Sequence, residues 1–324
     1  MKKILAPILS VIILVGVTLG AFFLIKGAIP KNKTYSLSIG VNVSEDFAKS
    51  KVSHTVAAIV TDKDGKIVAL RLDTLDYTAK VDENGALVIT KPQTKMELGS
   101  NYGMASWGGA IAEWDAQAKH FESYVTGMTL EQVLAITNDM QSPDAPADLV
   151  AGCTISSSVP EFKNAIKKAF DNQYKTTFTT TGAVKLGVAI SPAVSDTSDN
   201  DNNLITLKYG YSAIAEAEGK IVGAILDESE NVLKVEIENK AITSAAWNSG
   251  NKLQTKLEQG DNYGMVAWGG ANGEWHTQAQ NYANTAIGKA TTGLTDLPIE
   301  NVTGCTIYMG NMKQTLIKAA GNVR

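Results

Sequence analysis

The chain has 324 residues, of which 44% are hydrophobic and 19% are charged, so it is neither a disordered tail nor a coiled coil. Residues 1–33 hold five lysines and no acidic residue, which leaves 24 basic against 33 acidic side chains in the remainder. An acidic body argues against a nucleic-acid partner, because the phosphates would repel it. Two cysteines and three scattered histidines exclude a disulfide-rich scaffold, and we expect no metal site.

An uncharged, apolar run of 22 residues occupies positions 4–25 and is followed by Lys26. As a helix, a run of this length spans about 33 Å, enough to cross the hydrocarbon core of a bilayer. A cleaved signal peptide, the alternative, has a shorter apolar region and a small-x-small cleavage site, which residues 27–30 do not supply. We therefore expect residues 1–33 to be a retained N-terminal transmembrane anchor, with the body of the protein outside the cytoplasm.

The elements expected next are strands, followed by helices. Residues 55–61 and 66–72 predict two strands joined by the turn at 62–65, and a second turn at 82–85 precedes a strand at 86–90. Trp114, Ala118, Phe121 and Val125 fall at the spacing of one helical face and predict a helix. A capping box at Thr129 and Gln132 opens a short helix over 130–136. A last helix begins near Pro160. Strands followed by helices indicate an α+β fold with an antiparallel sheet.

The main feature of the sequence is an internal duplication. Residues 94–129 align without a gap to residues 255–290, and 17 of the 36 aligned positions are identical. The motif Gly-Cys-Thr-Ile at 152–155 recurs at 304–307, so the period suits a duplicated domain rather than a solenoid. We predict two homologous domains, at 34–170 and 184–324, joined by a polar, threonine-rich linker at 171–183.

The repeated Gly-Cys-Thr-Ile motif precedes a predicted helix in each copy. The N-terminus of a helix offers free N–H groups and the positive end of a dipole, both of which suit a phosphate. Thr154 and Thr306 are therefore candidate phosphate contacts or attachment points. The alternative is a purely structural turn, with a buried small thiol and a threonine that caps the helix.

The segment 148–156 resembles the flavinylation motif of FMN-binding domains, Asp-x-x-Ser/Ala-Gly-Ala-Thr, whose threonine carries FMN through a phosphoester bond. The segment 300–307 is similar to it, with Glu300 in place of Asp, and cysteine replaces the family's alanine in both copies. Three further features follow the same order as in that family. They are the Asp-Gly-Lys-Ile hairpin at 64–67, the Tyr-Gly-Met turn at 102–104 and the helix that contains Trp114.

The resemblance is to the flavin-carrying subunits of sodium-pumping quinone reductases, and more closely to membrane-anchored flavinylated proteins of Gram-positive extracellular electron transfer. It implies two FMN-binding-like domains that each carry covalent FMN on a threonine, with attachment at the second site less certain because its flanking residues differ from the motif. The implied site residues around the motif are Asp148, Gly152, Cys153, Thr154 and Ile155 in the first copy, and Glu300, Gly304, Cys305, Thr306 and Ile307 in the second. For the flavin ring, the candidates are Tyr102, Met104, Trp107, Tyr263, Met265 and Trp268.

If the resemblance holds, the protein is an electron carrier rather than a stand-alone enzyme. Its expected partners are a flavin transferase, a membrane quinone-linked electron donor and extracellular electron acceptors. Two alternatives remain open at this stage: a cell-surface binding or structural protein that carries no flavin, and a flavin-dependent reductase of one specific small molecule.

Overall fold

The computed structural model describes residues 31–136, 153, 155, 158–192 and 197–324. It is a mixed α+β protein with antiparallel sheets and packed helices, as expected from strands followed by helices. The predicted anchor at 4–25 lies outside the described residues. Within those residues, no helix is long and apolar enough to span a membrane.

Two antiparallel sheets occupy the centre of the molecule. The first has the strand order β3-β2-β1-β6, and the second has the order β11-β10-β9-β7, with β8 paired to β9 and a separate small pair of β4 and β5. In chain order the strands are β1 (Lys33–Asp46), β2 (Lys51–Thr61), β3 (Ile67–Thr78), β4 (Lys80–Val81), β5 (Leu87–Val88), β6 (Thr176–Thr180), β7 (Lys185–Pro192), β8 (Thr197–Asp199), β9 (Leu204–Ala217), β10 (Lys220–Glu238) and β11 (Ala241–Trp247).

The helices follow the strands in each half of the chain, as the sequence predicts. Capping boxes at Thr94 and Thr255 open two equivalent short helices, and the predicted capping box at Thr129 opens a third. The helices are η1 (Phe47–Lys49), α2 (Lys95–Leu98), η2 (Gly99–Tyr102), α3 (Trp114–Val125), α4 (Leu130–Leu134), α5 (Val159–Asp171), α6 (Lys256–Gln259), η3 (Gly260–Tyr263), α7 (Met265–Gly269), α8 (Trp275–Ala283), η4 (Asn284–Ala286) and α9 (Gly310–Gly321).

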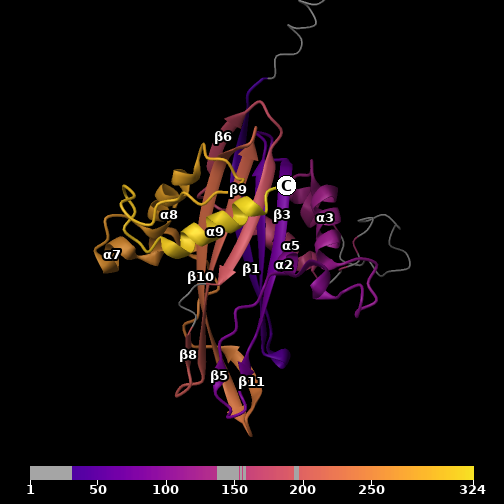
Figure 1. Ribbon diagram of the computed structural model, residues 1–324, viewed down its shortest axis with the longest axis vertical. Coiled ribbons are helices and arrows are strands. Elements are labelled where there is room, and N and C mark those ends of the chain that lie inside the picture. The colour runs from indigo at the N-terminus through magenta and orange to yellow at the C-terminus, as the bar shows by residue number, and fades with distance from the viewer. Residues whose placement is uncertain (1–30, 137–152, 154, 156–157, 193–196) are drawn as a thin grey trace, which may run out of the picture.

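The elements form four layers. Helices α3 and α5 pack on the outer face of the first sheet, and α8 and α9 pack on the outer face of the second sheet. The inner faces of the two sheets pack on each other through β1, β2, β3 and β6 against β7, β9 and β10. In Figure 1, α3 lies to the right of the sheets and α8 to the left, so the two halves place their helices on opposite sides of a shared centre.

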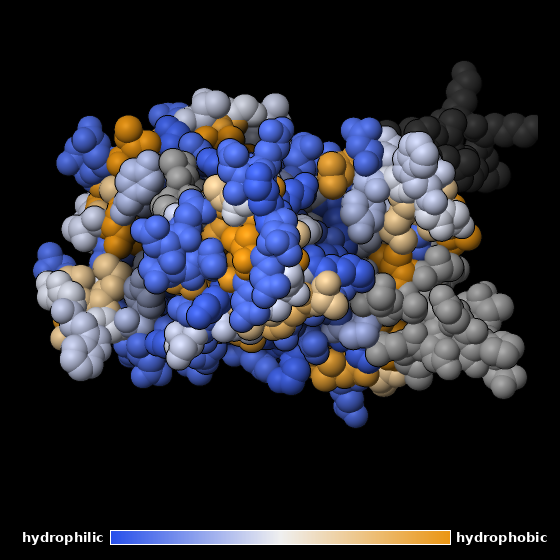
Figure 2. Space-filling view, turned by 90° about the horizontal axis from the view of Figure 1, so that it is seen from below, coloured by the Kyte–Doolittle hydropathy of each residue, from blue (hydrophilic) through white to orange (hydrophobic). Residues whose placement is uncertain are grey.

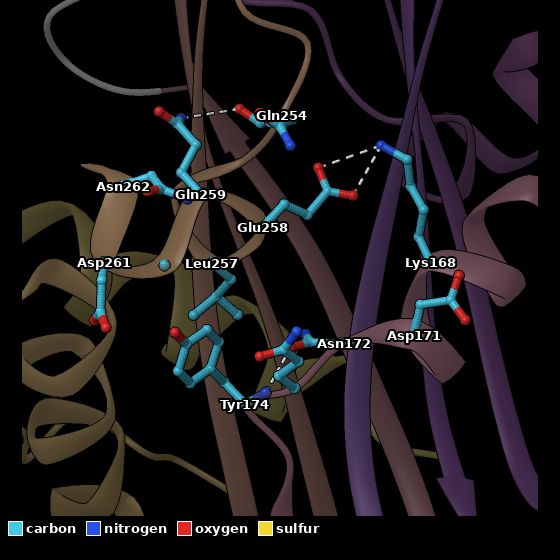
Figure 3. A pocket seen from close by; sticks show the side chains of 12 residues that line it. Lys168, Asp171, Asn172, Tyr174, Gln254, Leu257, Glu258, Gln259, Asp261 and Asn262 are labelled. Carbon is cyan, nitrogen blue, oxygen red and sulfur yellow. Dashed lines mark hydrogen bonds and ion pairs between the residues drawn. The ribbon is translucent and has the colours of Figure 1, made fainter. Parts of the chain in front are cut away.

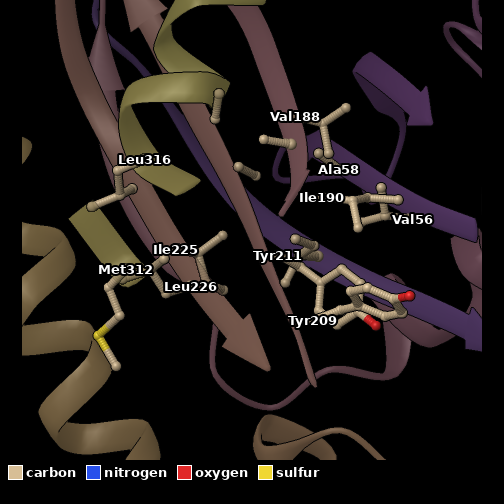
Figure 4. Close-up of a cluster of buried hydrophobic side chains, with 14 of the residues drawn as sticks. Val56, Ala58, Val188, Ile190, Tyr209, Tyr211, Ile225, Leu226, Met312 and Leu316 are labelled. Atoms are coloured by element: carbon tan, nitrogen blue, oxygen red, sulfur yellow. The ribbon is translucent and has the colours of Figure 1, made fainter. Parts of the chain in front are cut away.

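The layer between the sheets contains a continuous apolar core. Val56 and Ala58 of β2 face Val188 and Ile190 of β7 across this layer (Figure 4). The exposed surface has the opposite character. Seen from the end that carries β5 and β11, it is mostly hydrophilic, and its hydrophobic residues stand in small groups (Figure 2).

One polar chain lies inside the core between the sheets. The Tyr211 hydroxyl lies 2.6 Å from His54 Nδ1 and 2.6 Å from Ser229 Oγ. The His54 ring is fully buried and also packs edge-on against Tyr209, with 4.6 Å between ring centroids. Burial lowers the pKa of His54 to about 3, so the ring is neutral at physiological pH and serves as a packing and hydrogen-bonding group.

Reciprocal contacts join the two halves. Lys168 of α5 forms an ion pair with Glu258 of α6 at 2.9 Å, and Lys318 of α9 forms one with Glu97 of α2 at 2.8 Å. Each half therefore uses its last helix to contact the capped turn of the other half. The predicted linker at 171–183 also takes part in joining the halves. It contains β6, which pairs with β1 at the edge of the first sheet and contacts β10 of the second sheet.

Equivalent glycines bring the last helix of each half close to its sheet. A Cβ atom at Gly40 would lie 2.2 Å from the Ala169 nitrogen, and one at Gly187 would lie 2.1 Å from the Ala319 oxygen. Asn172 and Asn322, just after these helices, donate hydrogen bonds to the carbonyls of β1 and β7 at 2.9 and 3.0 Å. The absence of a side chain at two strand positions thus sets the distance between helix and sheet.

Candidate functional site

A cavity of about 380 Å³ lies in the second half, where the first turn of α9 approaches the segment 256–265. This volume suits one small-molecule ligand of cofactor size. The cavity brings together side chains from β9 and β10, from the Tyr-Gly-Met turn, from the last residue of the Gly-Cys-Thr-Ile motif and from the start of α9. The lining residues that enter the argument are Tyr209, Lys256, Tyr263, Met265, Trp275, Ile307, Tyr308 and Asn311.

Thr306 immediately precedes two residues that line the cavity, and its side chain is exposed. The buried amide of Gln278 holds this threonine, because Gln278 Oε1 accepts hydrogen bonds from the Thr306 N–H at 2.7 Å and from its hydroxyl at 3.0 Å. Gln278 in turn donates to the Gly273 carbonyl at 2.8 Å. The hydroxyl is therefore both oriented by the protein and reachable from solvent.

The Tyr-Gly-Met turn is held by a carboxylate at the start of the next helix. Glu274 accepts hydrogen bonds from the backbone N–H groups of Met265 at 2.9 Å and Val266 at 3.0 Å. Glu113 does the same for Met104 and Ala105 in the first half, at 2.9 and 3.1 Å. These glutamates thus fix the turn that supplies candidate ring contacts.

A lysine lies within the aromatic wall of the cavity. The Lys256 ammonium lies 5.1 Å from the ring centroid of Tyr263 and 5.2 Å from that of Trp275, and it pairs with Glu228 at 2.6 Å. Burial opposes this charge, but the Glu228 carboxylate holds the pKa of Lys256 above its usual range. The site therefore contains a permanent cation next to aromatic rings.

One residue that lines the cavity has a buried amide oxygen. Asn311 is 7% exposed, and its Oδ1 has no hydrogen-bond partner among the described residues. A buried acceptor without a partner is costly, because it has lost its hydrogen bonds to water. Because Oδ1 is itself inaccessible to water, a ligand in the cavity would not reach it. The aromatic walls and the cation are what the cavity offers, and they suit a planar aromatic ligand.

The first half repeats several of these features. Lys95 lies 5.3 Å from the Tyr102 ring centroid and 5.6 Å from that of Trp114, and it pairs with Asp76 at 3.4 Å. Tyr102 and Met104 pack at the edge of the core that α3 and α5 form with the first sheet. Cys153 and Ile155 are buried in the same core. Asp148, Gly152 and Thr154 lie outside the described residues.

Two predicted ring contacts stand apart from the cavity. Trp107 is 92% exposed and Trp268 is 90% exposed, and Trp268 does not line the cavity. The Trp268 ring instead lies beside Gly264, on the outside of the turn. The structure thus places Tyr263, Met265 and Ile307 around one cavity, and it leaves both tryptophans in solvent.

The remaining predicted residues of the second half surround the attachment motif. Gly304 adopts a left-handed conformation with φ of +71°, and its carbonyl accepts a hydrogen bond from Asn281 at 2.9 Å. Glu300 is exposed. Cys305 is buried, and burial raises the pKa of its thiol, as it does for Cys153. Both cysteines are free and lie in the cores of different halves.

Sequence reasoning missed several residues of this site, among them Lys256, Trp275, Gln278 and Asn311. A signal for three of these was present, because Lys256, Trp275 and Gln278 recur in the first copy of the repeat as Lys95, Trp114 and Gln117. Asn311 has no such signal, since it follows the motif within a divergent helix.

A larger cavity of about 670 Å³ lies where α5 meets α6 and η3. Figure 3 shows that its walls are mainly carboxylates and amides, with Tyr174 as the aromatic member and the Lys168–Glu258 ion pair across it. It lies between the two halves and contains none of the predicted site residues. Tyr174 is the one aromatic residue that the described part of the chain contributes to its lining, whereas several aromatic residues line the smaller cavity.

Comparison of the chain with protein-family models, with curated protein sequences and with solved structures finds no match in any of the three.

Proposed function

We propose that the protein is a membrane-anchored extracytoplasmic flavoprotein with two homologous FMN-binding-like domains. In this proposal Thr154 and Thr306 each carry covalent FMN, and the protein passes electrons from a membrane quinol or dehydrogenase system to extracellular acceptors. The single observation that carries it is the convergence of two separate repeat motifs on one cavity. Tyr263 and Met265 of one motif and Ile307 of the other line the same space, next to Thr306.

The residues of this cavity divide the work of holding FMN. Gln278 orients the threonine to which the phosphate would be joined, while Tyr263 and Trp275 offer apolar surface to the ring. When bound, FMN supplies the redox chemistry, and the chain contributes position, electrostatics and exclusion of water. A covalent bond prevents loss of the cofactor by dilution outside the cell.

Electron transfer is tested with the flavin-loaded full chain in membrane vesicles that contain a quinol-linked dehydrogenase. The proposal predicts that donor substrate bleaches the visible flavin absorbance and that a soluble ferric acceptor restores it. The double variant Thr154→Ala/Thr306→Ala is the matched control and should show neither change. Flavin that stays oxidised with the donor present, although dithionite reduces it, would contradict the carrier role.

A flavin-free surface protein is the second candidate, and the two exposed tryptophans favour it. Trp107 and Trp268 occupy equivalent exposed positions in two copies that have diverged at about half of the aligned residues. Exposed tryptophans are common anchors of protein–protein contacts. This candidate predicts a colourless protein even after co-expression with a competent flavin transferase.

A further inference from the structure

The charged side chains that line the cavity of the second half are balanced in pairs. Lys256 pairs with Glu228 at 2.6 Å, and these side chains are 16% and 19% exposed. Lys208 pairs with Glu230 at 3.1 Å nearer the solvent, with side chains 36% and 48% exposed. Because the inner pair is the more buried, its charges act on a ligand with less screening by water.

Reduction of an FMN ring places negative charge inside this cavity. Two electrons from a reductant and one proton at N5 leave one net negative charge on the ring, spread over the N1 and C2 carbonyl edge. A nearby ammonium favours this form over the neutral oxidised ring. Without Lys256, Glu228 would leave an unbalanced negative charge beside the ring and would disfavour its reduction.

We propose that Lys256 is a positioning residue that stabilises the reduced, anionic FMN ring in the second site and so raises its reduction potential. The inference rests on the proposed function, since it takes FMN as the occupant of the cavity. Three features support it: the place of the ammonium in the cavity wall, its distances of 5.1 and 5.2 Å from the Tyr263 and Trp275 rings, and its partial burial.

The first half supports the same role for a lysine. Lys95 occupies the equivalent repeat position, between Tyr102 and Trp114, and its carboxylate partner is Asp76, two residues along β3 from Thr74, the residue equivalent to Glu228. The position of the carboxylate differs between the halves, whereas the lysine and the two aromatic rings beside it are retained. Each half thus places a lysine beside two aromatic rings together with a carboxylate partner, so the surroundings of Lys256 recur in the first half.

The experiment is a reductive titration with dithionite of the full chain carrying Thr154→Ala, so that only the second site holds FMN. We compare it with Lys256→Met, Lys256→Arg and Lys208→Met in the same background. We expect Lys256→Met to weaken binding of the reduced ring relative to the oxidised ring about tenfold, which lowers a two-electron potential by about 30 mV. Lys256→Arg, which keeps the charge, and Lys208→Met, at the mouth of the cavity, should each change the ratio less than threefold.

A second readout separates an electrostatic role from a structural one. Once the cation is removed, the reduced ring should take up a second proton, so the potential of Lys256→Met should fall more steeply with pH. If this variant unfolds because Glu228 loses its partner, Lys256→Met/Glu228→Gln removes both charges and should still have a lower potential than the parent.

The failures of the two proposals are distinguishable. A parent protein without FMN would overturn the proposed function, and this inference with it. A loaded parent whose potential and pH slope are unchanged by Lys256→Met would overturn the role of Lys256 alone.

Discussion

Two equivalent buried carboxyls should make the stability of this protein fall as pH rises toward neutrality. Asp73 of β3 and Asp227 of β10 accept hydrogen bonds from the capped turns of α2 and α6, and both are fully buried. Burial raises the pKa of each to about 7, although hydrogen bonds from Thr94 and Thr255 and from backbone N–H groups favour the charged form. In the unfolded chain each carboxyl would return to its ordinary value of 3.8.

The sign and size of the effect follow from proton linkage. Between the ordinary and the raised pKa, the folded protein retains protons that the unfolded chain has released, so each carboxyl lowers the free energy of unfolding by about 1.4 kcal/mol per pH unit as pH rises. His54 acts in the opposite direction between about pH 3 and its ordinary value of 6.5, because its buried ring stays neutral while the unfolded chain binds a proton. Two carboxyls against one histidine leave a net fall of about 1.4 kcal/mol per pH unit around pH 5 to 6.

The assay is urea unfolding at several pH values across this range. The double variant Asp73→Asn/Asp227→Asn leaves only the histidine effect, so its stability should rise with pH by about 1.4 kcal/mol per unit, which reverses the sign seen in the parent. Asp76→Asn is the matched control. Burial opposes the charged form of Asp76, but Lys95, Ser53 and Lys51 together hold its pKa below the usual range. Its effect on stability therefore lies at lower pH, and Asp76→Asn should leave the slope around pH 5 to 6 unchanged.

The slope, rather than the absolute stability, decides the outcome. Asparagine alters hydrogen bonding at every pH, and such an effect shifts the whole curve without changing its slope. A double variant with the same negative slope as the parent would refute the reasoning, because the carboxyls would then not be the groups that retain protons.

Further predictions concern the close helix–sheet contact and the attachment site. Gly40→Ala and Gly187→Ala should each lower the free energy of unfolding, measured by urea unfolding, by about 3 kcal/mol, because the new methyl group overlaps the backbone of α5 or α9. Gly321→Ala, with open space around it, should cause no loss in the same assay. Gln278→Leu should reduce the fraction of chains flavinylated at Thr306 about fivefold, equivalent to about 1 kcal/mol of lost hydrogen bonding. Intact mass measures that fraction, and equal loading of Gln278→Leu and of the control Gln280→Leu would contradict the role of Gln278.

Local patterns predicted the helices well. Trp114, Ala118, Phe121 and Val125 lie at the spacing of one helical face, and all four are buried in α3. The side chains of Thr129 and Gln132 likewise form the predicted capping box of α4. Such features depend on residues within a few positions of one another, so the sequence reports them directly.

The face-to-face contact between the sheets was not predicted, because it depends on residues far apart in the chain. A signal was nevertheless present. The strand β2 is apolar or buried at nearly every position, the pattern of a strand covered on both faces, whereas a strand with one solvated face would alternate. The segment 176–180 was interpreted as linker because it is polar, yet threonine is a good strand former and Phe178 points into the core.

The candidate site was predicted in part for a similar reason. Repetition identified the Tyr-Gly-Met turn and the Gly-Cys-Thr-Ile motif, and both reach the same cavity. Repetition does not distinguish a buried aromatic residue from an exposed one, so Trp268 was grouped with Tyr263. The place of Asn311 in the cavity depends on how α9 packs against the sheet, which only the folded chain reveals.

The intact mass of the protein after co-expression with a flavin transferase tests the central claim most directly. The account predicts two covalent FMN increments, one lost in Thr154→Ala, the other lost in Thr306→Ala, and both lost in the double variant. A protein without any increment, under conditions that modify a known acceptor, would contradict covalent flavinylation.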